Sequence, residues 1–229
     1  MALYAIGDLH LCLGAPKPMG VFGGNWDGYM DKLEAGLSVI GPEDTTVLLG
    51  DLSWALDLEQ SKRDFAWIDR IPGKKIILKG NHDYWWTTAT KFYNFCKENQ
   101  FSDQYILNNN HYEYENLAIC GTRGWFYEEN RSNDHDEKVF KRELIRLEAS
   151  LKSAGDKQIA VFLHYPPKYK GYECTEILDL FRKYGVRKCF YGHLHGPSHG
   201  LALEGMYDGV EYKLVSADRL DFKPYLIML

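Results

Sequence analysis

The sequence lacks the features of a membrane-spanning or secreted protein. No apolar run approaches the ~18 residues of a membrane span, and the N-terminus has neither the basic region nor the long apolar stretch of a signal peptide. The five cysteines are odd in number and form no C-x-x-C pair, which argues against a disulfide framework and a zinc knuckle. We therefore expect a cytoplasmic protein with no membrane span and with reduced, mostly buried thiols.

An excess of positive charge is missing as well. The formal net charge of −5 makes duplex nucleic acid an unlikely partner, because such binding depends on a basic surface that releases counterions. The 229 residues contain no low-complexity tract, no internal repeat and no Pro/Ser-rich linker. We therefore predict a single domain spanning residues 1–229.

What the sequence does contain is a series of short apolar runs, which we interpret as buried strands. They are Tyr4-Ala5-Ile6, Thr46-Val47-Leu48-Leu49, Lys75-Ile76-Ile77-Leu78, Ile159-Ala160-Val161-Phe162-Leu163 and Lys188-Cys189-Phe190-Tyr191. Apolar residues recur at helical spacing after Asp27, a predicted N-cap, after Asp136, and from Cys174 to Phe181. This alternation of strands and helices predicts a layered α/β fold.

Three further stretches depart from this alternation. After Gly200 the pattern changes to short alternating segments around 210–215 and 225–228, for which we predict an antiparallel end to the sheet with no helix between them. Two irregular stretches, 11–28 and 121–133, adjoin polar motifs. Long loops inside a compact domain are often functional, and the alternative is a surface connection without a role.

Polar residues directly follow the predicted strands, and they are of types that bind metals. Seven of them are candidate metal ligands: Asp8, His10, Asp51, Asn81, His164, His193 and His195. The carboxyl ends of parallel strands meet at one edge of a sheet, where ligands bind. In an extended segment, residues two apart point the same way, so Asp8 with His10, and His193 with His195, could each present two ligands to one side.

The charge of such a site suggests its chemistry. Two divalent ions bring four positive charges, Asp8 and Asp51 remove two, and a bridging hydroxide would leave about +1. This surplus suits a phosphoryl group, and the ions would also lower the pKa of a bound water. The residues therefore favour hydrolysis of a phosphoester by a hydroxide held between two metal ions.

The ordered motifs Asp-x-His, Gly-Asp, Gly-Asn-His-Asp, His and Gly-His-x-His, which run from Asp8 to His195, resemble the calcineurin-like metallophosphoesterase family. The resemblance implies a four-layer α/β/β/α sandwich with two central mixed sheets and a metal site at the carboxyl edge of the strands. It also implies two divalent or trivalent transition-metal ions, chosen from Mn, Fe, Zn, Co and Ni, with Mn or Fe favoured.

The resemblance further assigns roles to single residues. One ion would be held by Asp8, His10 and His195, and the other by Asn81, His164 and His193, with Asp51 bridging the two. His82 would lie beside the leaving group, stabilise the transition state and protonate the departing oxygen. Asp83 would orient or tune nearby catalytic groups.

One motif departs from the family's protein phosphatases, which read Gly-Asp-x-x-Asp-Arg-Gly where this chain has Gly50-Asp51-Leu52-Ser53-Trp54-Ala55-Leu56. The phosphate-binding arginine is missing, which disfavours a Ser/Thr protein phosphatase. We predict that Arg123, in a glycine-flanked loop, binds substrate phosphate instead, since guanidinium binds phosphate bidentately. The alternative for Arg123 is a surface salt bridge.

Other aromatic and histidine side chains receive a structural interpretation. Core packing is favoured for Trp54, Trp85 and Trp86 over an aromatic wall around the substrate. His111, His135 and His199 lie outside every motif and are expected to be structural or exposed.

The sequence thus predicts a phosphohydrolase that cleaves a phosphomonoester or a small phosphodiester. Two alternatives are a non-catalytic scaffold of the same fold that binds proteins, and a metal-dependent hydrolase of a non-phosphate ester. The expected partner is a small phosphorylated substrate. The natural substrate, the metals used in the cell and the oligomeric state stay open at this stage.

Overall fold

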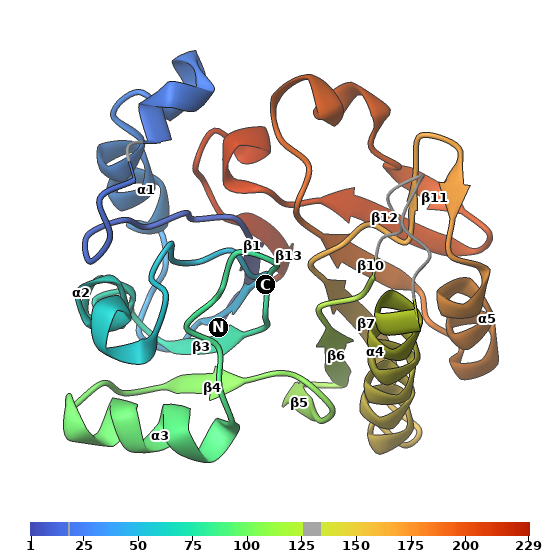
Figure 1. Ribbon diagram of the computed structural model, residues 1–229. Coiled ribbons are helices and arrows are strands. Elements are labelled where there is room, and N and C mark those ends of the chain that lie inside the picture. The colour runs from blue at the N-terminus through green and yellow to red at the C-terminus, as the bar shows by residue number, and fades with distance from the viewer. Residues whose placement is uncertain (18, 126–133) are drawn as a thin grey trace.

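Two central sheets form the middle of the protein, and helices lie against their outer faces (Figure 1). The computed structural model describes residues 1–17, 19–125 and 134–229. The first sheet consists of β1 (Leu3–Ile6), β2 (Thr45–Leu48), β3 (Lys74–Ile77), β4 (Gln104–Ile106) and β13 (Tyr225–Met228). Its strand order is β13-β1-β2-β3-β4, in which β1 to β4 run parallel and β13 is antiparallel to β1.

The second sheet also combines a parallel centre with antiparallel edges. It consists of β5 (His111–Tyr114), β6 (Leu117–Thr122), β7 (Gln158–Leu163), β10 (Lys188–Tyr191), β11 (Gly205–Tyr207) and β12 (Val210–Leu214). The order is β11-β12-β10-β7-β6-β5, and only the edge strands β5 and β11 are antiparallel to their neighbours. Two short strands, β8 (Lys168–Tyr169) and β9 (Tyr172–Glu173), form a separate hairpin.

The strands are apolar on both faces because each sheet is covered on both sides. In β7, Ala160 and Phe162 pack into the layer between the sheets, whereas Val161 and Leu163 pack toward the helices. Side chains alternate between the two faces of a strand, so a continuous apolar run fills two layers at once. The predicted four-layer sandwich with two mixed sheets is confirmed.

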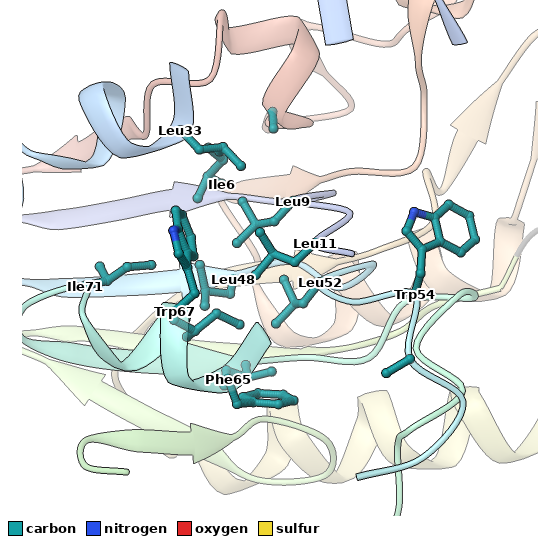
Figure 2. Close-up of a cluster of buried hydrophobic side chains, with 14 of the residues drawn as sticks. Ile6, Leu9, Leu11, Leu33, Leu48, Leu52, Trp54, Phe65, Trp67 and Ile71 are labelled. Carbon is teal, nitrogen blue, oxygen red and sulfur yellow. The ribbon is translucent and has the colours of Figure 1, made fainter. Parts of the chain in front are cut away.

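Five α-helices cover the outer faces within the described residues. They are α1 (Tyr29–Leu37), α2 (Leu58–Asp69), α3 (Ala89–Glu98), α4 (Asp134–Ser153) and α5 (Thr175–Tyr184). The first three pack on the first sheet and the last two on the second (Figure 1). In Figure 2, Leu9, Leu11 and Leu52, which neighbour the predicted ligands in sequence, point into the core beneath the first sheet's helices. These leucines anchor the loops that carry the site.

Two local predictions are wrong. The N-cap of α1 is Gly28, at φ 63°, rather than Asp27, because the chain enters this helix through a left-handed turn that glycine adopts without strain. A 3₁₀ helix at Ala217–Leu220 separates β12 from β13, where no helix was expected. The antiparallel strands at the C-terminal end, β11 and β13, also lie in different sheets, and β12 runs parallel to β10.

The cysteines and the helices agree with the other expectations. All five cysteines are free; Cys12 is half-buried and the others are buried. Among the helices described, none has the length and apolarity needed to cross a membrane. The predicted helical stripes after Asp136 and from Cys174 correspond to α4 and α5.

Candidate metal centre

The predicted ligands come from both sheets and lie at the carboxyl ends of their strands. The first sheet supplies Asp8 and His10 after β1, Asp51 after β2 and Asn81 after β3. The second sheet supplies His164 after β7, and His193 and His195 after β10. Parallel neighbours end at a common edge, so these loops meet where the two sheets adjoin.

Four of these residues have a left-handed backbone. The φ angle is 60° at Asp8, 48° at His10, 50° at Asp51 and 72° at His193. The prediction that Asp8 with His10, and His193 with His195, project from extended segments is therefore wrong. A non-glycine residue in this region costs about 1–3 kcal/mol and persists only where its surroundings hold it. Here Asp8 N donates to Gly50 O and His10 N donates to Asp51 O, each at 2.9 Å.

Asp8, His10 and His195 form one group of converging ligand atoms, all within 4.8 Å of one another. His195 Nε2 lies 3.6 Å from Asp8 Oδ1 and 3.3 Å from His10 Nε2. His10 Nδ1 is buried and has no hydrogen-bond partner among the described residues. Burial and the charge of His195 lower the pKa of His10 well below its usual value, so its ring is neutral and can donate a lone pair.

A second group consists of Asp8, Asp51 and His164. His164 Nδ1 lies 2.9 Å from the carbonyl oxygen of Leu49, which can only accept, so Nδ1 carries a hydrogen. In the neutral ring the lone pair is then on Nε2, which faces Asn81 Oδ1 at 2.8 Å and Asp51 Oδ2 at 3.5 Å. Three electron-pair donors that face one another without hydrogens form a suitable environment for a cation.

His193 lies beside the second group. Its ring centroid is 5.2 Å from that of His164 and 4.6 Å from that of Tyr165. Its backbone N–H donates to both carboxylate oxygens of Asp8, at 3.0 and 3.2 Å. Burial lowers the pKa of His193 to about 3, so the ring is neutral. The donor set of carboxylate, amide and neutral imidazole fits two transition-metal ions, with Asp8 in both groups.

Asp218 is a part of the site that the sequence interpretation missed. Its Oδ1 lies 2.8 Å from His195 Nδ1, and its Oδ2 lies 3.3 Å from His199 Nε2. A carboxylate behind a metal-binding imidazole fixes the ring and its tautomer. Burial opposes protonation of His195, but the hydrogen bonds to Asp218 and Asp8 outweigh it and raise its pKa to about 10.

The sequence contains a signal for Asp218, whereas the expectation for His199 is not met. Asp218 follows β12 closely, so the same rule of polar residues after strands could have found it. His199, interpreted as structural or exposed, instead belongs to a cluster with His195 and Asp218.

His82 faces the cavity next to the two groups. Its backbone N–H donates to Asp51 Oδ1 at 2.7 Å, and its ring lies 4.4 Å from that of Trp54. Burial and the charge of Lys17 lower the pKa of His82 to about 4. At neutral pH the ring is therefore uncharged and offers one N–H donor.

Asp83 lies beneath the site rather than in it. The side chain is fully buried and accepts hydrogen bonds from the backbone N–H groups of Asp51, Leu52 and Gly80 and from the indole of Trp85. These bonds fix the Asp51 loop against the Asn81 loop. Burial also raises the pKa of Asp51 to about 7 in the absence of metal.

A cavity of about 640 Å³ opens beside the predicted metal ligands. Its walls include His10, Asp51, His82, His193 and His195, together with residues of the 11–28 stretch. Trp54 is buried in the hydrophobic core, as was favoured, and it also lines this cavity. Trp85 packs against Phe65 and Phe92 in the core as predicted.

Arg123 is not among the described residues that line this cavity. Its Nη2 lies 3.8 Å from Glu143 Oε1, and its guanidinium carbon lies 6.0 Å from the Tyr165 ring centroid. It thus lies on the His193 side of the ligands. The remainder of the irregular 121–133 stretch, including Phe126, Tyr127, Glu128 and Glu129, falls outside the described residues.

The chain belongs to the calcineurin-like phosphoesterase family, whose sequence profile matches residues 1–197. Solved structures with a similar fold include the phosphopantetheinyl hydrolase of Mycobacterium tuberculosis, with 16% identity and a TM-score of 0.60 over 99% of this chain and 95% of that chain. A protein of unknown function from Aquifex aeolicus has 18% identity and a TM-score of 0.53 over 98% and 95%.

A third similar structure, from Thermus thermophilus, has 14% identity and a TM-score of 0.59 over 99% of this chain and 97% of that chain. At these identities the structures show a shared fold only. No protein with a curated description matches the sequence.

Proposed function

We propose that this protein is a metal-dependent phosphohydrolase that cleaves a phosphomonoester or a small phosphodiester. One observation carries the proposal: two groups of ligand atoms that share Asp8 converge beside His82 at the wall of one cavity. Family membership supports phosphoester hydrolysis in general. The same donor set would be hard to explain in a protein that only binds other proteins.

In this proposal Asp8, His10 and His195 hold one metal ion, Asn81, His164 and His193 hold the other, and Asp51 lies between them. When bound, the ions supply a water of lowered pKa and offset the negative charge that develops on the phosphoryl group. Asp8 is the carboxylate common to both groups of ligand atoms, whereas Asp51 belongs to the second group, where its Oδ2 faces His164 and its Oδ1 accepts from the His82 N–H. The bridging role of Asp51 is part of the proposal.

The other residues act around the reacting phosphate. His82 donates a hydrogen bond from the N–H of its neutral ring toward the leaving oxygen and stabilises the negative charge that develops there; transfer of a proton to this oxygen would require the imidazolium form of His82, which the negative charge of a bound phosphate favours. Asp83 holds the Asp51 and Asn81 loops and is a positioning residue. Arg123 is proposed to bind a non-bridging oxygen from the side of His193.

The test is release of p-nitrophenol from mono- and bis-p-nitrophenyl phosphate by protein stripped with EDTA and then reloaded with Mn²⁺. We expect turnover only after reloading. Inactivity across Mn²⁺, Fe²⁺, Zn²⁺, Co²⁺ and Ni²⁺ would favour a non-catalytic scaffold. Faster turnover of p-nitrophenyl acetate than of the phosphoesters would favour a hydrolase of another ester.

A substrate panel would narrow the class. It should span nucleotides, cyclic nucleotides, sugar phosphates and lipid head groups. A phosphopantetheinyl ester should be added because one protein of the same fold is named for hydrolysing that group.

A further inference from the structure

Lys17 lies in the wall of the cavity and has no role in the site described above. It belongs to the irregular 11–28 stretch, which supplies Lys17, Met19 and Trp26 to the cavity wall. Among the described residues that line the cavity, Lys17 is the only lysine or arginine.

The position of Lys17 is set by Trp54. Lys17 Nζ lies 2.9 Å from the centroid of the Trp54 ring, in a cation–π contact. The same ring stacks on His10 at 4.9 Å and contacts His82 at 4.4 Å, and its indole N–H donates to Met19 Sδ at 3.1 Å. Trp54 thus places the ammonium next to a predicted metal ligand and the predicted leaving-group histidine.

The ammonium of Lys17 is not neutralised by a carboxylate. No ion pair to Lys17 is present within the described part of the chain, whereas Arg123 faces the buried carboxylate of Glu143. Burial lowers the pKa of Lys17, and the negative charge of Asp51 counteracts this effect. A lysine beside a metal centre without its own anion is available for an anionic ligand.

We propose that Lys17, held on Trp54, is a second cation, in addition to Arg123, that binds the phosphate of the substrate, and that it does so from the wall of this cavity; this inference rests on the proposed phosphohydrolase function. The chain has Trp54 and Ala55 where the family's protein phosphatases have Asp and Arg. The indole therefore occupies the place of the acid, and Lys17 supplies from another loop the positive charge that Ala55 cannot.

The charges agree with this assignment. Two divalent ions with Asp8, Asp51 and a hydroxide would leave a surplus of about one positive charge, and Lys17 adds a second on the side of His82. A phosphate group carries one or two negative charges, and both contacts neutralise it from different directions. Lys17 would thus bind an oxygen that the ions leave free and keep the phosphorus in line with His82.

The experiment measures binding of inorganic phosphate to Mn²⁺-loaded protein by calorimetry, together with kcat and KM for bis-p-nitrophenyl phosphate. Lys17→Met should weaken phosphate binding and raise KM by about 10- to 100-fold, the loss of one charge-assisted hydrogen bond. Lys17→Arg should restore most of this loss. The matched control is Lys91→Met, which removes an exposed lysine on α3.

Metal content and melting temperature separate this role from a structural one. In Lys17→Met both should stay at the wild-type values, and Lys17→Gln serves as a second variant if the first is unstable. Wild-type phosphate affinity and KM in both variants would overturn the proposal. So would a loss of phosphate binding in Arg123→Met with none in Lys17→Met.

The outcomes also separate this proposal from the proposed function. If wild-type protein binds phosphate through Lys17 but hydrolyses no phosphoester, the function fails and the anion site stands. If wild-type protein hydrolyses phosphoesters and the Lys17 variants behave like it, the function stands and the anion site fails.

Discussion

His82 and Asp51 contact each other, but we expect substitution of each to have a different effect. His82→Ala removes a ring that lies 6.1 Å from that of His10, and it keeps the hydrogen bond to Asp51, which comes from the backbone, so it should retain both ions. Its kcat should fall by about 10²- to 10⁴-fold, most for substrates with poor leaving groups. Asp51→Asn should lose metal, because it removes the anion that is proposed to lie between the ions. Elemental analysis and turnover of the two variants provide the test, and equal metal loss in both would contradict these separate roles.

Asp218 offers a second comparison among single residues. Asp218→Ala leaves His195 Nδ1 without its acceptor and should lower metal affinity by about 10- to 100-fold. Asp218→Asn keeps an acceptor oxygen and should lose less. The control is Asp221→Asn, an exposed residue three positions further along the chain. Titration with Mn²⁺ followed by calorimetry measures the effect, and unchanged affinity in Asp218→Ala would exclude the positioning role.

Single residues were predictable from the sequence where chemistry and position in a motif coincide. The metal-binding candidates follow strands directly, and their side chains do converge, although their individual roles stay predictions. Lys17 was missed because it reaches the site through a contact with a residue distant in sequence, Trp54. Asp218 follows a strand, as the predicted ligands do, but only its contact with His195 shows that it belongs to the site. A motif records neighbours along the chain and contains no information on such contacts.

Where two loops of the site approach closely, only a residue without a side chain fits between them. A Cβ added at Gly192, between β10 and His193, would lie 2.5 Å from Asp8 Oδ2. Gly192→Ala should therefore displace the Asp8 carboxylate and lower both metal content and stability, the latter by about 1–3 kcal/mol.

The matched control for this prediction is Gly200→Ala. A Cβ at Gly200 would meet nothing within 4 Å, and this residue lies nine positions after the end of the same strand. Metal analysis and denaturant unfolding compare the two variants. If both retain metal equally, the approach of Gly192 to Asp8 does not position the carboxylate.

Strands were easier to predict than the loops that follow them. Apolar runs such as residues 159–163 are buried on both faces, so burial alone fixes their extent. Loop conformation depends on hydrogen bonds between segments, such as Asp8 N to Gly50 O, and these hold Asp8 and His10 in the left-handed region. The spacing of the polar residues alone predicts an extended chain there, because it contains no information on these hydrogen bonds. In the same way, residue type favours Asp27 as an N-cap, although Gly28 occupies that position.

For the whole molecule, metal binding is expected to release protons. Without metal, hydrogen bonding raises the pKa of His195 to about 10, and burial raises that of Asp51 to about 7. A cation must displace the protons that these groups hold, so metal affinity should rise with pH. The folding stability of the metal-free protein changes with pH in the opposite direction. Because the pKa of His195 is higher in the folded protein than the 6.5 of an unfolded chain, protonated His195 stabilises the fold fully below pH 6.5, and this stability is lost as pH rises through about 10.

The melting temperature with Mn²⁺, minus that with EDTA, measures this coupling between pH 6.5 and 8.5. We expect the difference to increase with pH, since tighter binding to the folded state stabilises it further. His195→Asn should flatten the increase. A difference that is constant over this range in wild-type protein would contradict the proton release.

The architecture as a whole was predictable because the ordered motifs identify a family with a shared fold. The single domain and the two metal ions stay predictions. The pairing of strands across the chain, such as β13 beside β1, was not predictable from local pattern, since it joins the two ends of the sequence.

The carboxylates come from one sheet and most of the imidazoles from the other, so ions bound between them would cross-link the two halves of the molecule. The stability of the contact between the two sheets and the metal content of the site would then rise and fall together. A substitution in the interior, for example at the stacked pair Phe162 and Phe190, would appear in solution as poor metal retention although it touches no ligand. Before an inactive variant is taken to have lost a catalytic residue, its stability should therefore be measured to establish that the two sheets still pack together.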